Sequence, residues 1–151
     1  MSSTRRLLLA VLLIGIVGTT AELVLLEHYE NPWQLVPLVL LAAGTFVLIW
    51  HAARPGKASA IVLRTTMSLF LAAGILGVVL HFRANVEFQL ELDPEQSRTD
   101  IFWKAIRAKA PPALAPGVMV QLGLLGLIYG YAGPAAGGSG GRIAAGQGEE
   151  R

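Results

Sequence analysis

The sequence predicts an all-α membrane protein, a four-transmembrane-helix bundle with a short extracytoplasmic strand-plus-helix lid. Hydrophobic residues make up 54% of the 151-residue chain and charged residues 15%, well below the roughly 25% charge of a typical soluble domain. The apolar residues also gather in four blocks, each close to the ~20 residues that a helix needs to cross a bilayer. The chain has no cysteine, which excludes disulfides, Cys-ligated zinc, iron–sulfur clusters and thiol catalysis.

Each apolar block is expected to be helical, because a backbone amide in lipid finds its hydrogen-bond partner only within the segment itself. We expect a membrane domain over residues 1–132, with spans at about 7–28, 33–51, 60–82 and 111–131. Residues 133–151 are rich in Gly and Ala, so a disordered cytoplasmic tail is expected there. Aromatic residues at the block ends resemble interfacial belts; they are Tyr29, Trp33, Trp50, Trp103, Tyr129 and Tyr131.

The distribution of basic residues predicts the orientation. The loop between the second and third blocks holds Arg54 and Lys57, with Arg64 just beyond it, whereas the 27–33 turn has no Lys or Arg. Because cytoplasmic loops are enriched in these residues, we expect both termini in the cytoplasm of a bacterium and the chain as a multi-pass protein of the inner (plasma) membrane. The net charge of +2 is divided between loops, so the bilayer is the expected partner and nucleic acid is not.

Residues 83–110 are predicted to form a lid on the outer side. Residues 86–93 alternate apolar and polar side chains, which is typical of a strand with one buried face. Ser97 and Asp100 then fit a capping box for a short helix over residues 101–110. A lone strand is stable only when it pairs, so a second copy of the chain, giving a dimer, is the expected partner.

Polar residues near the outer ends of the first and third spans form the candidate site. Glu22 lies sixteen residues after Arg6, about 24 Å along a helix and so within a ~30 Å hydrocarbon core. A carboxylate there costs roughly 2.5–3.5 kcal/mol, which favours either an ion, proton or ligand site or a protonated side chain with an internal partner. His28 and His81 should lie at similar depth. The candidate metal ligands are Glu22, Glu27, His28, His81 and Glu87, and the rest of the polar layer is Glu30, Arg83, Asn85 and Gln121.

These residue types allow three functions. Imidazole and carboxylate without thiolate suit a divalent metal ion, and two histidines from different spans also suit haem. The first hypothesis is a membrane protein whose outer Glu/His layer binds a metal ion or small polar ligand. The second is a proton- or cation-coupled transporter or channel subunit that uses Glu22, and the third is a structural or accessory subunit without a ligand. No nucleophile elbow, phosphate loop or metalloprotease motif occurs, so an enzyme is disfavoured and no catalytic residue is predicted. His51 is expected at the cytoplasmic interface.

Two runs of the sequence resemble a set of small bacterial inner-membrane proteins to which no activity is assigned. One runs from Gly77 to Phe88 and includes Leu80-His81-Phe82, Asn85 and Glu87, and the other is Pro112-Ala113-Leu114-Ala115-Pro116-Gly117 followed by Met119 and Gln121-Leu122-Gly123-Leu124. The resemblance covers the four spans but not the tail. It implies a bacterial inner membrane and adds no catalytic or binding residue.

Overall fold

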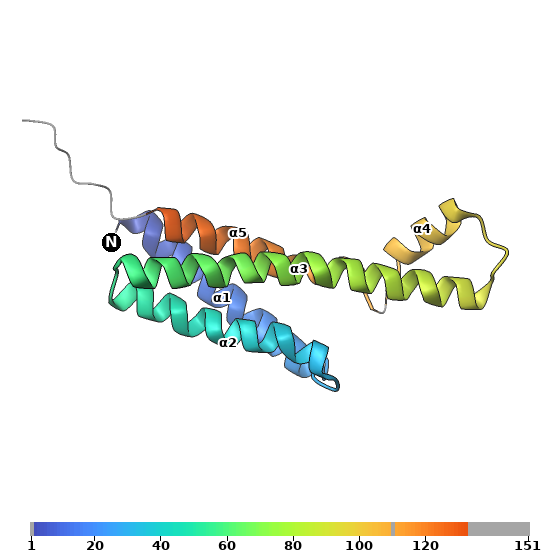
Figure 1. The fold of residues 1–151 in the computed structure, drawn as a ribbon, viewed down its shortest axis with the longest axis horizontal. Coiled ribbons are helices and arrows are strands. Elements are labelled where there is room, and N and C mark those ends of the chain that lie inside the picture. Colours follow the sequence, from blue (N-terminus) through green and yellow to red (C-terminus); the bar gives the residue numbers. More distant parts are fainter. Residues whose placement is uncertain (1, 110, 133–151) are drawn as a thin grey trace, which may run out of the picture.

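The described residues fold into five helices (Figure 1), of which the longest, α3, packs against α2, α4 and α5, while α1 packs against α2 and α5. The computed structural model describes residues 2–109 and 111–132, so the predicted tail lies outside the described residues. The helices are α1 Ser3–Leu25, α2 Pro32–Ala53, α3 Lys57–Leu92, α4 Arg98–Ile106 and α5 Gly117–Tyr131. Three of them, α1, α2 and α3, are long and apolar enough to cross a membrane. The predicted all-α class is therefore confirmed for the described residues, and three helices of membrane-spanning length and composition stand where four spans were predicted.

The helix boundaries differ from the predicted spans at three places. Helix α1 ends at Leu25 rather than at residue 28, and α3 continues ten residues beyond residue 82. Helix α5 begins at Gly117 instead of residue 111, because the proline-rich run before it folds into turns. With 15 residues, α5 is about 22 Å long, shorter than the ~30 Å core that the first two helices match.

The predicted strand in the lid is wrong. Residues 86–92 form the last two turns of α3, and no strand occurs in the described parts of the chain. The helix is already nucleated upstream, so adding residues to it costs little, and most of this segment consists of good helix formers such as Glu, Gln and Leu. A strand would have needed a partner strand. The end of α3 instead packs against helix α4, which folds back along it (Figure 1).

The predicted N-cap of the lid helix at Ser97 is confirmed, although the helix begins at Arg98 rather than at residue 101. The backbone N–H of Asp100 donates to Ser97 Oγ at 3.1 Å, and Ser97 Oγ in turn donates to Asp100 Oδ2 at 2.8 Å. This hydrogen bonding satisfies an amide that the first helical turn leaves free. Helix α4 ends at Ile106, four residues earlier than expected. The lid is thus the α3–α4 hairpin, in which the end of α3 projects beyond α1 and α2.

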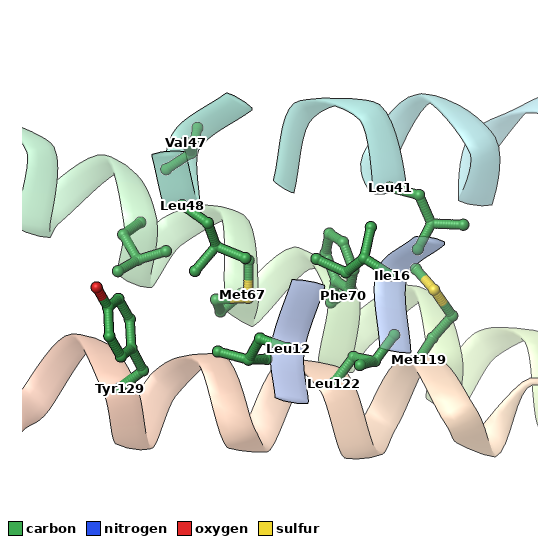
Figure 2. Close-up of a cluster of buried hydrophobic side chains, with 11 residues drawn as sticks. Leu12, Ile16, Leu41, Val47, Leu48, Met67, Phe70, Met119, Leu122 and Tyr129 are labelled. Atoms are coloured by element: carbon green, nitrogen blue, oxygen red, sulfur yellow. The ribbon is translucent and has the colours of Figure 1, made fainter. Parts of the chain in front are cut away.

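The core lies where α1, α2 and α5 meet the first half of α3. Figure 2 shows side chains from all four helices converging there. The fully buried side chains include Leu12, Leu41, Met67, Phe70 and Tyr129. The core ends where α1 and α2 end, so the α3–α4 hairpin packs separately, through Ile101 and Ala105.

Two ends of this bundle are distinguished below. The Arg5 end holds the start of α1, the 54–56 turn and the end of α5, while the His81 end holds the α1–α2 turn and the base of the α3–α4 hairpin. This arrangement follows from the alternating directions of α1, α2 and α3 and from the contacts of α5 with α3.

The turn at the His81 end contains a strained residue. Glu27 has φ 52°, the only non-glycine residue with positive φ among those described. The N–H groups of Glu27 and His28 donate to Val24 O at 3.1 Å and Leu23 O at 2.9 Å, which is the Schellman pattern that usually has glycine at this position. A side chain there costs roughly 1 kcal/mol or more.

We therefore expect Glu27→Gly to raise the free energy of unfolding of the metal-free protein by about 1 kcal/mol, because glycine removes the left-handed strain. Denaturant titration of the purified protein measures the change. Glu27→Ala is the matched control, since it removes the same carboxylate but keeps the strain. An equal gain in both variants would show that charge, rather than backbone conformation, is responsible.

Candidate functional site

The structure brings together the two histidines that the sequence expected at similar depth. His28 lies in the α1–α2 turn and His81 lies on α3, and their ring centroids are 6.3 Å apart in an edge-to-face arrangement. Fifty-two residues separate them in the sequence. Both side chains are half-buried, so the pair is reachable from solvent at the His81 end of the bundle.

Hydrogen bonds hold the backbone of His28 and the imidazole of His81. His28 follows Glu27 in the Schellman turn, where the backbone N–H of His28 donates to Leu23 O. His81 Nδ1 lies 3.1 Å from Pro112 O. A carbonyl oxygen can only accept, so Nδ1 is assigned the proton, and in the neutral ring Nε2 keeps a free lone pair.

The environment keeps His28 neutral. Burial lowers its pKa from the usual value of 6.5, and the nearby His81 lowers the pKa further, since two positive imidazolium rings repel each other. The protonated form is therefore disfavoured at neutral pH. His28 therefore keeps a ring-nitrogen lone pair at neutral pH.

Asn85 is a buried polar residue that links α3 to two neighbouring segments at the His81 end. It is 3% exposed, and its Nδ2 donates to Ala105 O at 3.2 Å and to Pro111 O at 3.0 Å. These bonds join α3 to the end of α4 and to the proline-rich run before α5. Together with the bond from His81 to Pro112, they hold the base of the α3–α4 hairpin to the start of the fourth apolar segment.

The predicted carboxylate ligands do not join the histidine pair. Glu22, Glu27, Glu30 and Glu87 are all exposed, and Glu87 lies 3.9 Å from Arg83 in a solvent-exposed ion pair. Gln121 is exposed on the outer surface of α5. Within residues 2–109 and 111–132, no group of three or more His, Asp or Glu side chains is placed to hold a metal ion.

The opposite end contains a polar cluster that the sequence did not predict. His51 was expected at the interface and Tyr129 in an aromatic belt, but both are buried, together with Arg5 and Ser59. The rotation of each helix about its own axis decides which of its residues are buried. Helices α1, α2 and α5 have apolar residues around most of their circumference, so their sequences do not determine that rotation. A sequence signal does exist in retrospect, because Arg5, His51 and Tyr129 all fall within three residues of a helix end on the same side of the bundle.

No protein-family model, curated protein or solved structure matches this chain. The resemblance to small bacterial inner-membrane proteins therefore stays a prediction.

Replacing Asn85 tests whether it holds the hairpin base together. We expect Asn85→Leu, which is similar in size, to lower the free energy of unfolding by about 1–3 kcal/mol, because the two hydrogen bonds of the buried Asn85 amide to Ala105 O and Pro111 O are lost. Hydrogen exchange should rise first in α4 and the run before α5. Glu87→Gln, which removes only an exposed ion pair, is the control and should change neither quantity; equal effects of the two variants would contradict the assignment.

Proposed function

We propose that this chain is a non-enzymatic four-pass protein of a bacterial inner membrane, with both termini cytoplasmic, and that it binds a divalent transition-metal ion between His28 and His81 on its outer face. The observation that supports the metal site is the 6.3 Å separation of two imidazoles from distant parts of the sequence.

The fourth pass consists of α5 together with the turns before it. Gly77 of α3 contacts Pro116 and His81 reaches Pro112, so residues 112–117 run beside α3 from the level of His81 to that of Gly77. The run 111–117 contains three prolines that lack an N–H, and side chains of α3 bind its Pro111 and Pro112 carbonyls. Irregular backbone is tolerated at membrane depth when protein groups satisfy it in this way.

The spacing of the two rings suits one shared metal ion. An ion held at about 2.1 Å by one nitrogen of each imidazole keeps the ring centroids about 5–6.5 Å apart, depending on the nitrogen–metal–nitrogen angle. The observed separation of 6.3 Å corresponds to a wide angle, and a small rotation of either ring reaches the tetrahedral value.

The hydrogen bond from His81 to Pro112 also suits this role. Metal-binding histidines usually donate their other ring N–H to a carbonyl or carboxylate, which orients the ring and raises its basicity. With two protein ligands, the remaining coordination positions fall to water. Such a site favours Zn²⁺, Ni²⁺ or Cu²⁺ over Mg²⁺ or Ca²⁺, because imidazole suits the former.

The polar surface of the bundle favours self-association as part of the same proposal. Glu22 and Gln121 are both exposed on helices that would otherwise face lipid, where an unpartnered polar group is costly. A second copy of the chain offers partners for them. The transporter hypothesis for Glu22 has less support, because its side chain points away from the core rather than into it.

Metal titration of tag-free protein tests the proposal. We expect about one equivalent of Zn²⁺ per chain by calorimetry, with His28→Ala and His81→Ala each weakening binding about tenfold or more, since each removes one of two protein ligands. His51→Gln, which removes the histidine at the other end, and Glu87→Gln, which removes a ligand expected from the sequence, should leave the affinity unchanged. Binding that survives loss of both His28 and His81 would refute the site.

The same titration has a defined pH dependence. Protons compete with the metal for imidazole, and the pKa of His28 lies below 6.5, so binding should be full above that pH and fall as the solution becomes more acidic. A Zn²⁺ affinity that is constant from pH 8 to pH 5 would exclude histidine ligation.

A further inference from the structure

A buried cationic cluster lies at the Arg5 end, far from the histidine pair. It consists of Arg5 on α1, His51 on α2, Ser59 on α3 and Tyr129 on α5, and all four residues are buried, with Arg5 7% exposed and Tyr129 0%. We call these residues the Arg5 cluster. Because each comes from a different helix, the cluster forms only when the whole bundle is assembled.

The hydrogen bonds of the cluster leave Arg5 as an uncompensated charge. Arg5 Nη2 lies 2.9 Å from His51 Nε2, and His51 Nδ1 lies 2.9 Å from Ser59 Oγ. A guanidinium only donates, so Nε2 of His51 accepts and the imidazole is neutral, with its proton on Nδ1. Arg5 therefore has a neutral partner, and its positive charge is buried beside neutral groups.

Two donors of the cluster are buried without an acceptor. Arg5 Nε and Tyr129 Oη make no hydrogen bond within the described chain. The two side chains are in contact, since the Arg5 guanidinium carbon lies 4.8 Å from the centre of the Tyr129 ring. An unsatisfied buried donor costs about 1–3 kcal/mol, and more when it is charged. Among the described residues both donors lack an acceptor, and the Arg5 guanidinium also lacks a negative charge beside it.

No acidic side chain of the described residues supplies that charge. The one ion pair among them joins Arg83 and Glu87 in the α3–α4 hairpin. Every described Asp and Glu lies at or beyond Glu22 on α1 or in the α1–α2 turn and the α3–α4 hairpin. The described basic residues at the Arg5 end are Arg5, Arg6, Arg54, Lys57 and Arg64. This end is thus strongly positive, with its most buried cation lacking a counter-ion.

We infer that the Arg5 cluster binds a phosphate group, supplied by the headgroup of an anionic phospholipid. A phosphate oxygen accepts from the Arg5 guanidinium and from the Tyr129 hydroxyl, which satisfies both unpaired donors and neutralises the buried charge. Because both donor atoms are closed off in this conformation, binding includes a side-chain rotation of Arg5 or Tyr129 that opens them to the ligand.

The position of the cluster favours a lipid over a soluble ion. It lies at the ends of helices that are long and apolar enough to cross a membrane; in a bilayer these ends reach headgroup depth, where basic pockets between transmembrane helices bind acidic lipids. Arg64 supports the same placement, since its Nε and Nη2 donate to Gly130 O at 3.3 and 3.1 Å and its guanidinium lies 4.1 Å from the centre of the Tyr131 ring. That contact holds the end of α5, and with it Tyr129, beside α3.

Native mass spectrometry of the full chain tests the assignment, with phosphatidylglycerol, phosphatidylcholine and inorganic phosphate titrated separately. We expect phosphatidylglycerol to bind wild type about tenfold more tightly than phosphatidylcholine, because only the former has net charge. Arg5→Gln should remove this preference. Arg6→Gln is the matched control, because it removes the same charge from the neighbouring exposed position, and it should keep the preference.

Tyr129→Phe provides a test that changes no charge and leaves the ring in the core. We expect it to weaken phosphatidylglycerol binding about three- to tenfold, because one hydrogen bond to a charged group is lost. Unchanged binding in Tyr129→Phe, or equal losses in Arg5→Gln and Arg6→Gln, would overturn the proposal and leave only non-specific electrostatic attraction between the basic end of the protein and the lipid.

Arg5-dependent binding of inorganic phosphate without a preference for phosphatidylglycerol would support the phosphate site and overturn the lipid as its source. A lipid preference that emerges only after Glu149→Gln and Glu150→Gln would assign the site to the chain's own carboxylates and overturn the proposal.

Discussion

The close contact between α3 and α5 is the constraint on which both ends of the molecule depend. A Cβ atom added at Gly123 would lie 2.8 Å from Leu71 N and from Met67 O, so the backbones of the two helices nearly touch. Small residues permit such an approach between membrane helices, where packing replaces the hydrophobic effect as the driving force. Met67 also fills the space above Gly126, which fixes the rotation of α5 as well as its distance.

This contact sets the register of the two helices and so positions their ends. Pro116 lies against Gly77, and Gly130 accepts hydrogen bonds from Arg64; the two fixed points are about 20 Å apart on either helix. At one end the register brings Pro112 to His81, which orients the ring facing His28. At the other end it brings Tyr129 beneath Arg5. The proposed metal site and the proposed phosphate site therefore share one structural origin, although they use opposite chemistry, neutral imidazole at one end and a buried cation at the other.

Much of the helical layout could be predicted from the sequence, because hydrophobic block length directly reports the helices that match a bilayer. The cap at Ser97 and the adjacency of His28 and His81 could also be predicted, the first from the local sequence pattern and the second from the equal depth of the outer ends of the first and third spans. The strand predicted over residues 86–93 is wrong because the alternation of polar and apolar residues was considered alone, although the preceding span was already helical and continues through this segment. The helix start predicted at residue 111 is wrong because the apolar composition of residues 111–116 hid the effect of their three prolines, which prevent a regular helix there.

The Arg5 cluster could not be predicted for a different reason. Arg5 and His51 occur where membrane proteins commonly place solvated basic residues, and only the rotation of α1 and α2 about their axes buries them. The apolar faces of these helices are too uniform for the sequence to fix that rotation. The contact of α3 with α5 supplies the missing information, since it carries Tyr129 into the centre of the bundle.

A matched pair of glycine substitutions measures this contact most directly. A Cβ at Gly123 would meet the backbone of α3, whereas a Cβ at Gly18, also within a helix, would meet nothing within 4 Å. Reversible unfolding in mixed micelles should show that Gly123→Ala lowers the free energy of unfolding by about 1–3 kcal/mol through overpacking, while Gly18→Ala raises it by up to about 1 kcal/mol through helix propensity. If Gly123→Ala is as neutral or as stabilising as Gly18→Ala, α5 does not lie against α3 in this way.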